Sequence, residues 1–485
     1  MGAPVSQIHA FDGSLVRGLA WTGAVKWCSQ LLSWLSTIVV ARLLMPEDYG
    51  LVTMAGVLLG MISLFNEFGL GAAVVALRNI TEDQITRIHG LASLFGAVGF
   101  LVSCLVAIPA GQFFGAPEVA RIMMVMGVGL VLVSMRSVPT AVLEKDLRFK
   151  FLAFLEGGQS IVATLTTLGL AWWGAGYWAL VGGGLAGSAA ATAVLTVYRP
   201  LRRTWPTVQA LREVIRFSSH VLVSRVAGYA AVTSDLLIAG RMLGEAVVGI
   251  YSFANTLANI PMEKVTALAS RVMPAFYSSV QTDPSALRRY LLLLTEGLSL
   301  ITFPVGIGVS FVAEDGVGML LGAKWLDAVA PLKILACWAV FRSVFTLTTP
   351  ILYVTGGSRL AMYNSLLCAM LYPLGFLLGS RWGAVGLAFA WIVVQPPSWV
   401  PIYYHVLRAI GLPFWTYLGA LRPAFVGTAS MAGGIFLFMH VIPPDTLPSV
   451  RLVGEVVCGA VIYSSVVMLF YRDRLMQFVA LIRSA

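Results

Sequence analysis

The chain has 485 residues, of which 58% are hydrophobic and only 11% are charged, and its formal net charge is +10. A mean hydropathy of +0.86 excludes a soluble globular protein, because so few polar residues cannot cover a surface in water. We therefore predict an all-α polytopic membrane protein, since helices satisfy their own backbone hydrogen bonds within lipid.

Apolar segments that are long enough to cross a bilayer follow one another along the chain. Prolines inside several of them, such as Pro304 and Pro373, indicate kinked helices rather than loops. We predict about fourteen transmembrane helices, at residues 16–41, 50–77, 90–114, 119–141, 151–172, 176–198, 217–240, 246–270, 290–313, 328–352, 360–379, 383–407, 414–440 and 452–471.

The chain also contains an internal repeat, which appears when it is shifted against itself by about 199 positions. Matching segments, in the same order in both copies, are Arg42 with Arg241, Gly115-Ala116 with Gly322-Ala323, Arg136-Ser137-Val138 with Arg342-Ser343-Val344, and Trp173-Gly174-Ala175 with Trp382-Gly383-Ala384. Each copy holds six predicted spans, so both enter the membrane from the same side. This predicts two parallel six-helix bundles related by pseudo-twofold symmetry.

The repeat divides the chain into four predicted parts. They are an N-terminal six-helix bundle at 1–198, a cytoplasmic amphipathic linker at 199–216, a second six-helix bundle at 217–410, and two additional transmembrane helices with a cytoplasmic tail at 411–485.

The placement of basic residues predicts the orientation. Most of the 32 Lys and Arg residues lie in connecting segments on the N-terminal side of the predicted spans, so the positive-inside rule puts both termini in the cytoplasm. The densest basic run, Arg199 to Arg216, lies in the linker, where an apolar face fits a short helix at the membrane surface. Anionic membrane lipids, and no nucleic acid, are therefore the expected partners of this charge.

Features of an enzyme are missing from the sequence. No segment between predicted spans is long enough for a soluble catalytic domain, and neither a phosphate-binding glycine loop nor a cluster with metal-ligand spacing occurs. The five cysteines are scattered through apolar segments and are predicted to be core residues. We therefore predict no catalytic residue, no metal and no cofactor.

Two cations, Lys26 and Arg225, lie near the middle of long apolar segments, at equivalent positions of the repeat. A cation at this depth costs about 2.5 to 3.5 kcal/mol, so it normally faces a partner or a water-filled cavity. One such cation in each copy predicts a central site for an anion.

Polar residues recur at helical spacing in three predicted spans. A polar stripe must avoid lipid, so these spans, with Tyr229 on the seventh, are predicted to line one cavity between the halves, where Gln30, Tyr229, Asn255 and Asn259 contact the substrate. The alternative is that the stripes are hydrogen bonds that only hold helices together. The stripes are Lys26, Gln30, Ser33 and Thr37; Thr53, Gly56, Gly60, Ser63 and Glu67; and Ser252, Asn255, Asn259, Glu263, Thr266 and Ser270.

Further charged residues within the spans have less definite roles. Arg136 and Arg342 lie toward the predicted cytoplasmic ends of their helices, where snorkelling and substrate contact are both open interpretations. Asp235, Glu67 and Glu263 are candidate cavity acids that pair with cations or carry protons.

Several motifs resemble the polysaccharide transporter family, the Wzx-like lipopolysaccharide and exopolysaccharide flippases of the multidrug/oligosaccharidyl-lipid/polysaccharide (MOP) exporter superfamily. They are Ala41-Arg42-Leu43-Leu44-Met45-Pro46, the segment from Asp235 to Arg241, the segment from Gly249 to Ala254, and Gly322-Ala323-Lys324-Trp325. The resemblance covers nearly the whole chain.

This resemblance implies a function. It implies a multi-pass protein of the bacterial inner membrane that moves an undecaprenyl-pyrophosphate-linked oligosaccharide to the periplasmic face by alternating access. It also implies that cavity cations on the first and seventh helices, Lys26 and Arg225 here, hold the phosphates of the lipid-linked oligosaccharide. Polysaccharide polymerase and chain-length proteins are the implied protein partners.

Two other functions predict different sequences. A cation-coupled multidrug exporter of the same superfamily is expected to have an acidic cavity, whereas the deepest charges here are basic. A membrane-embedded glycosyltransferase or polysaccharide polymerase is expected to have a large periplasmic loop with acidic or arginine-rich sites. Neither feature occurs in this sequence, so the flippase is favoured.

Overall fold

The computed structural model describes residues 33–67, 74, 81–201, 225–281, 283–443 and 446–472, and all regular structure in these residues is helical. Eleven segments of the described part are long and apolar enough to cross a membrane, and one of them, Ser358–Ala409, contains two long helices. The chain is therefore a multi-pass membrane protein. The total of fourteen spans stays a prediction, because the first and seventh predicted spans lie partly outside the described residues.

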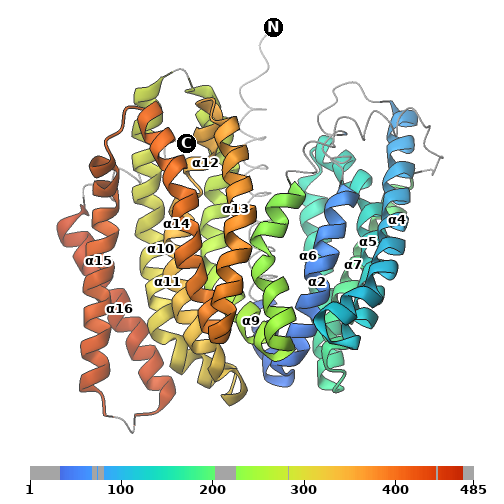
Figure 1. Cartoon of the computed structure of the whole chain (residues 1–485), viewed down its shortest axis with the longest axis horizontal. Helices are drawn as coiled ribbons and strands as arrows, with labels where there is room; N and C mark the ends of the chain where they lie inside the picture. The colour runs from blue at the N-terminus through green and yellow to red at the C-terminus, as the bar shows by residue number, and fades with distance from the viewer. Residues whose placement is uncertain are drawn as a thin grey trace, which may run out of the picture. The chain divides into compact units, whose positions relative to one another are not determined.

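The chain divides into two compact units, Met1–Tyr229 and Ala230–Ala485. In the first unit, α4 packs along α5, and α6 packs along α7 (Figure 1). Contacts between α5 and α7 join these two pairs, and α2 packs against α4, α5 and α7. Residues 202–216 of the predicted linker lie outside the described residues. The long helices of this unit are α2 (Pro46–Glu67), α4 (Glu82–Phe114), α5 (Pro117–Lys145), α6 (Phe149–Trp172) and α7 (Tyr177–Tyr198).

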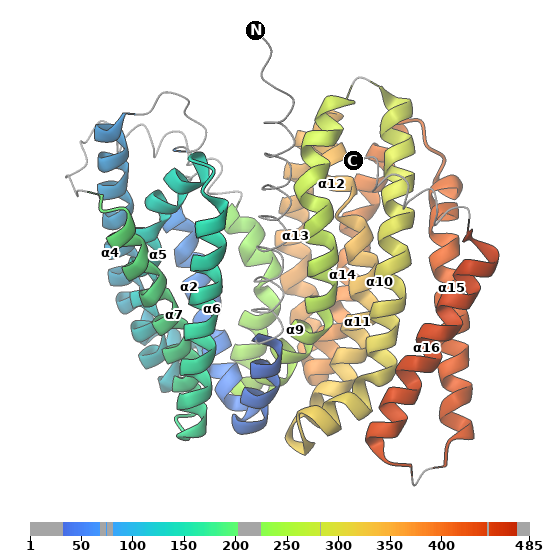
Figure 2. The same cartoon turned by 180° about the vertical axis from the view of Figure 1, so that it is seen from behind.

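The second unit is built around three long helices, α9, α10 and α11. Helix α9 packs on α11, α13 and α14, and α10 packs on α11 on one side and on the pair formed by α15 and α16 on another (Figure 2). Its elements are α9 (Ser234–Ser279), α10 (Pro284–Leu320), η1 (Ala323–Ala328), α11 (Val329–Phe345), α12 (Thr348–Val354), α13 (Ser358–Gly379), η2 (Ser380–Trp382), α14 (Gly383–Ala409), α15 (Phe414–Val441) and α16 (Pro448–Phe470).

Local sequence explains where several helices begin and end. Helix α4 begins with a capping box in which Thr81 and Gln84 satisfy each other's backbone N–H groups, and it ends at Gly115 in the left-handed region. Helix α10 begins after Asp283, whose carboxylate accepts hydrogen bonds from the backbone N–H groups of Ser285 and Ala286. Hydrogen bonds from Ser285 and Ala286 lower the pKa of Asp283, because they stabilise its charged form.

Helix α9 is interrupted at Gly244, where φ is 81° and ψ is 178°. This conformation is essentially restricted to glycine, because a Cβ atom would clash with the backbone. The break lies between the predicted seventh span, which ends at residue 240, and the predicted eighth span, which begins at residue 246. It therefore separates a short first arm from a long second arm of α9.

Side-chain burial fits a protein in a lipid solvent. Large apolar residues lie on the outer surfaces of both units, including Leu105 at 76% exposure and Leu469 at 78%. The interior of the second unit contains Trp325, which is fully buried and tilted against Phe253 with ring centroids 4.4 Å apart. This contact fixes η1 against α9.

Candidate functional site

The residues predicted to form the site fall into three groups. Lys26 and Gln30 lie outside the described residues, and Glu67 is the last residue of α2, with its side chain also outside the described part. Arg225 and Tyr229 lie at the end of the first unit, in a helical segment of residues 225–232, and Arg136 lies on α5 of the first unit. The second unit contains Asp235, Asn255, Asn259 and Glu263 on α9 and Arg342 on α11.

Arg342 is connected directly to the polar stripe of α9. Its guanidinium Nη2 donates a hydrogen bond to Oδ1 of Asn259. The Asn259 amide in turn donates to the backbone oxygen of Asn255, at 2.8 Å, and to its side-chain Oδ1, at 2.6 Å. Asn259 is only 8% exposed, so this chain of donors lies inside the unit rather than on its surface.

A second polar group lies where the two arms of α9 meet α14. Tyr251 donates to Oδ2 of Asp235 at 2.7 Å, and Nε1 of Trp391 donates to the Tyr251 hydroxyl at 2.8 Å. The backbone N–H of Leu236 donates to Oδ1 of Asp235, also at 2.7 Å. None of the three interacting side chains is more than 3% exposed, so each polar atom depends on the others to replace water.

Electrostatic interactions connect these two groups. The carboxylates of Asp235 and Glu263 are both close enough to Arg342 to interact favourably with its positive charge. Asp235 is fully buried, whereas Glu263 is exposed. Arg342 therefore occupies the centre of a polar network, defined here as Asp235, Tyr251, Asn255, Asn259, Glu263, Arg342 and Trp391.

Aromatic and amide side chains of α11 and α14 pack beside this network. Nε1 of Trp338 donates to Oε1 of Gln395, and the rings of Trp338 and Trp399 stack with centroids 5.1 Å apart. Their packing holds α11, and therefore the Arg342 backbone, against α14.

Arg136 in the first unit occupies the repeat position of Arg342, but it has a different partner. Its guanidinium Nη1 donates to Oε1 of Gln159 on α6, and the Glu156 carboxylate contributes a favourable electrostatic interaction. Both arginines thus bind an amide oxygen on another helix. The sequence alone predicted neither Gln159 as the partner of Arg136 nor Asn259 as the partner of Arg342.

Tyr229 is anchored on α2 of the same unit. Its hydroxyl donates to the backbone oxygen of Val57 at 3.1 Å, and the phenol ring lies directly over Gly60. A Cβ atom on Gly60 would approach the ring Cζ atom to 2.8 Å and the hydroxyl oxygen still more closely. Gly60 therefore provides the space in which the ring packs.

We expect Gly60→Ala to displace the Tyr229 ring and break its hydrogen bond to Val57. The added methyl group overpacks this contact, which typically costs about 1 to 3 kcal/mol. Gly56→Ala is the matched control, because a Cβ atom there meets nothing within 4 Å. Tyrosine fluorescence quenching and thermal unfolding in detergent measure the two effects, and equal behaviour of the two variants would contradict the packing role of Gly60.

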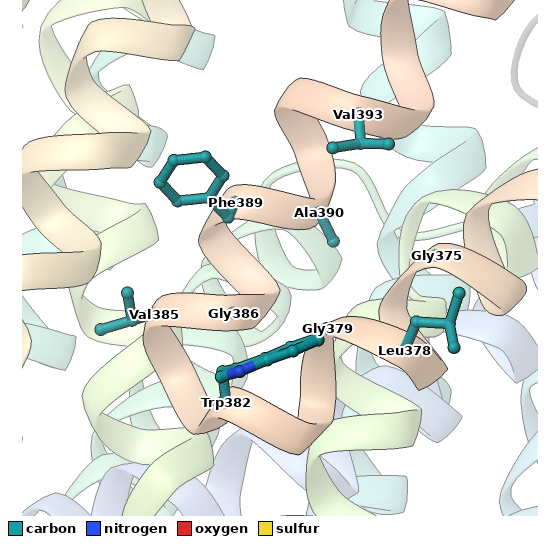
Figure 3. A pocket seen from close by; sticks show the side chains of 9 residues that line it. All are labelled: Gly375, Leu378, Gly379, Trp382, Val385, Gly386, Phe389, Ala390 and Val393. Carbon is teal, nitrogen blue, oxygen red and sulfur yellow. The ribbon is translucent and has the colours of Figure 1, made fainter.

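Two of the apolar depressions in the described part of the second unit lie outside the polar network. One, of about 410 Å³, is lined by residues of α13, η2 and α14, among them Leu378, Trp382 and Phe389 (Figure 3). The other, of about 670 Å³, is lined by α10, α11, α14 and α15, including Phe303, Trp399 and Tyr417. Their apolar linings suit hydrocarbon and offer few donors to an anion.

The sequence interpretation missed Tyr251 and Trp391 of the polar network. It also missed two amide partners outside the network, Gln159 of Arg136 and Gln395 of Trp338. Tyr251 and Trp391 belong to strongly apolar segments, where an aromatic residue normally signals packing rather than a hydrogen bond. Gln159 lies three residues after Glu156 on the same helix, and this spacing was the available signal for a polar face.

Comparison with known proteins identifies the family. The sequence profile described as "Polysaccharide biosynthesis protein" matches residues 39–330. The lipopolysaccharide biosynthesis protein WzxC of Escherichia coli is 21% identical over 81% of each chain, and the succinoglycan biosynthesis transport protein ExoT of Rhizobium meliloti is 23% identical over 97% of this chain and 96% of its own.

The fold also has a counterpart among solved structures. The lipid II flippase MurJ, in an inward closed conformation, superposes with a TM-score of 0.76 at 12% identity, covering 94% of this chain and all of MurJ. At this identity the match establishes the fold alone. The family profile and the relatives confirm the expected resemblance to polysaccharide transporters and the expectation of a transporter rather than an enzyme. The chain therefore belongs to the polysaccharide biosynthesis protein family.

Proposed function

We propose that the chain is a flippase that moves an undecaprenyl-pyrophosphate-linked oligosaccharide across the bacterial inner membrane by alternating access, for lipopolysaccharide or exopolysaccharide biosynthesis. Family membership supports a role in polysaccharide biosynthesis, and the names of ExoT and MurJ support transport of a lipid-linked glycan. The observation that carries the proposal is Arg342, a cation inside a membrane protein that is connected to a stripe of amides.

The chemistry of this stripe suits an oxygen-rich substrate. A guanidinium donates to phosphate through two parallel hydrogen bonds, and amides both donate to and accept from sugar hydroxyl groups. We assign sugar contacts to Asn255 and Asn259, phosphate contacts to Lys26 and Arg225, and further substrate contacts to Gln30 and Tyr229. Arg136 and Arg342 are additional cations for the same substrate.

Coupling and orientation complete the proposal. Asp235, Glu67 and Glu263 are the acids that we assign to energy coupling, because acids inside a membrane protein are costly unless they are functional or paired. Both termini lie in the cytoplasm, and polysaccharide polymerase and chain-length proteins receive the product at the far face.

Deleting the gene in its own host is expected to cause lipid-linked oligosaccharide to accumulate at the cytoplasmic face and to remove the polymer from the cell surface. In the deletion strain, the Arg342→Ala or Asn259→Ala variant should give an export rate at least about tenfold below that given by wild type. A hydrogen bond to a charged group contributes about 1.5 to 3 kcal/mol, which corresponds to a loss of this size. Radiolabelled lipid intermediates and surface glycan measure the two effects.

Thr256→Ala is the matched control for these variants. Thr256 lies on the same helix and is exposed, and its hydroxyl donates to the backbone oxygen of Ser252 at 2.8 Å. A deletion strain with normal surface polymer and no accumulated lipid intermediate would contradict the proposed function. Wild-type export by both network variants would contradict the site but not the function.

A further inference from the structure

An acid–arginine–acid cluster lies between α10 and α16, outside the polar network. Nε of Arg451, in the first turn of α16, lies 3.0 Å from Oδ2 of Asp315 on α10 and 3.4 Å from Oε1 of Glu455 on its own helix. The side chains become progressively more buried across the cluster, with exposures of 33% for Arg451, 17% for Asp315 and 0% for Glu455.

The charges in this cluster do not balance. Among the described residues, Arg451 is the one cation that forms an ion pair with Asp315 or Glu455. Two carboxylates therefore share one guanidinium. The second oxygen of Glu455, Oε2, is buried and accepts no hydrogen bond from a described residue. An anion without a full set of partners is unfavourable at such a site, because burial removes its hydration.

The two carboxylates also interact with each other. Because Nε of Arg451 lies 3.0 Å from Oδ2 of Asp315 and 3.4 Å from Oε1 of Glu455, the two carboxylates are close enough to repel when both are charged. One added proton removes the excess charge and allows the protonated group to donate a hydrogen bond to the other, as in carboxyl pairs that share a proton. The proton therefore improves both the charge balance and the hydrogen bonding of the cluster.

Within the described part of the chain, no ion pair joins Asp315 or Glu455 to a cation of α11 or α15. On α10, Glu314 lies next to Asp315, but it pairs with Lys333 of α11 at 3.2 Å. On α15, Ile435 and Phe438 are the side chains closest to Gly459 and Gly454 of α16, and the nearby titratable residue, His440, is exposed and bonded to the Phe436 backbone oxygen.

We propose that Asp315 and Glu455, bridged by Arg451, form a proton-binding site that holds one proton at neutral pH. The site joins α16 to the C-terminal part of α10. A second bond between these helices, from the Tyr463 hydroxyl to the Leu300 backbone oxygen at 2.6 Å, lies on the other side of Pro304. Proton release therefore weakens one of two attachments of α16 and leaves the other in place.

Infrared difference spectroscopy of the purified protein in detergent tests this proposal without any substrate, so its outcome is independent of the proposed function. Wild type at neutral pH should show the carbonyl stretch of one protonated carboxyl group, and this band should be lost on titration to alkaline pH. Glu455→Gln should lack the band. Asp315→Asn should lack it as well, because one carboxylate then faces one guanidinium.

Glu314→Gln is the control, since it neutralises the adjacent acid of the same helix and should retain the band. Retention of the full band in both Glu455→Gln and Asp315→Asn would overturn the proposal, as would its absence from wild type at neutral pH. The measurement should be repeated with sodium replaced by N-methylglucamine. A band that appears only without sodium would identify a sodium site instead and would also overturn the proposal.

Discussion

Replacing Arg225 with glutamate is expected to reduce glycan export at least about a hundredfold while the protein stays in the membrane. The change removes a cation that we assign to the substrate phosphates and replaces it with a charge that repels them. Two charge-assisted hydrogen bonds, at about 1.5 to 3 kcal/mol each, correspond to a loss of this size. Arg225→Lys should retain part of the activity, because lysine keeps the charge but loses bidentate contact with phosphate.

The matched control is Arg87→Glu. Arg87 is an exposed arginine whose Nε lies 2.8 Å from Asp83 one turn earlier on α4, and its reversal creates only a like-charge pair on a helix surface. Surface glycan, normalised to the amount of each variant in the membrane, is the measurement. If Arg225→Glu exported glycan as well as Arg87→Glu, the assignment of Arg225 to the substrate phosphates would be wrong. The Lys26→Glu variant would then test whether Lys26 contacts the phosphates.

Gly386→Ala is expected to destabilise the second unit, because the backbones of α13 and α14 come into close contact at this glycine. A Cβ atom on Gly386 would overlap the backbone oxygen of Gly379 and lie 2.8 Å from the Cβ atom of Trp382. A backbone oxygen cannot rotate away as a flexible side chain can, so the two helices must separate. We expect a loss of about 1 to 3 kcal/mol or more in the free energy of unfolding.

Thermal unfolding of the purified protein in detergent measures this loss, with Gly433→Ala as the control. A Cβ atom on Gly433, within α15, meets nothing within 4 Å, so this substitution should be neutral or stabilising by up to about 1 kcal/mol. Close approach of helices at small residues is a main source of packing in lipid. Equal melting temperatures for Gly386→Ala and wild type would rule out this crossing as an important contact.

The sequence was a good guide to the helices. Hydropathy predicted residues 383–407 and 414–440, and the structure has α14 at Gly383–Ala409 and α15 at Phe414–Val441. In the structure, Gly115 follows the end of α4 and Gly383 begins α14, and both have positive φ. These features are local, because a helix in lipid must satisfy its own backbone and its length follows from the bilayer thickness.

The site was predicted less completely, since side-chain partners depend on which helices pack together. Helical spacing placed Asn255 and Asn259 on one face of α9, and the structure joins these residues by hydrogen bonds. Their connection to Arg342 spans 83 positions in the chain, and the bond from Trp391 to Tyr251 spans 140. No local pattern specifies such pairings.

Gly60 and Asn259 have different surroundings although the predicted repeat aligns them. At the offset of about 199, Gly60 of α2 stands opposite Asn259 of α9. One copy now accommodates the Tyr229 ring, and the other accepts a hydrogen bond from Arg342. Mutational tolerance in one copy is therefore no guide to the other: Gly60→Asn displaces a ring, whereas Asn259→Gly leaves an arginine without its acceptor.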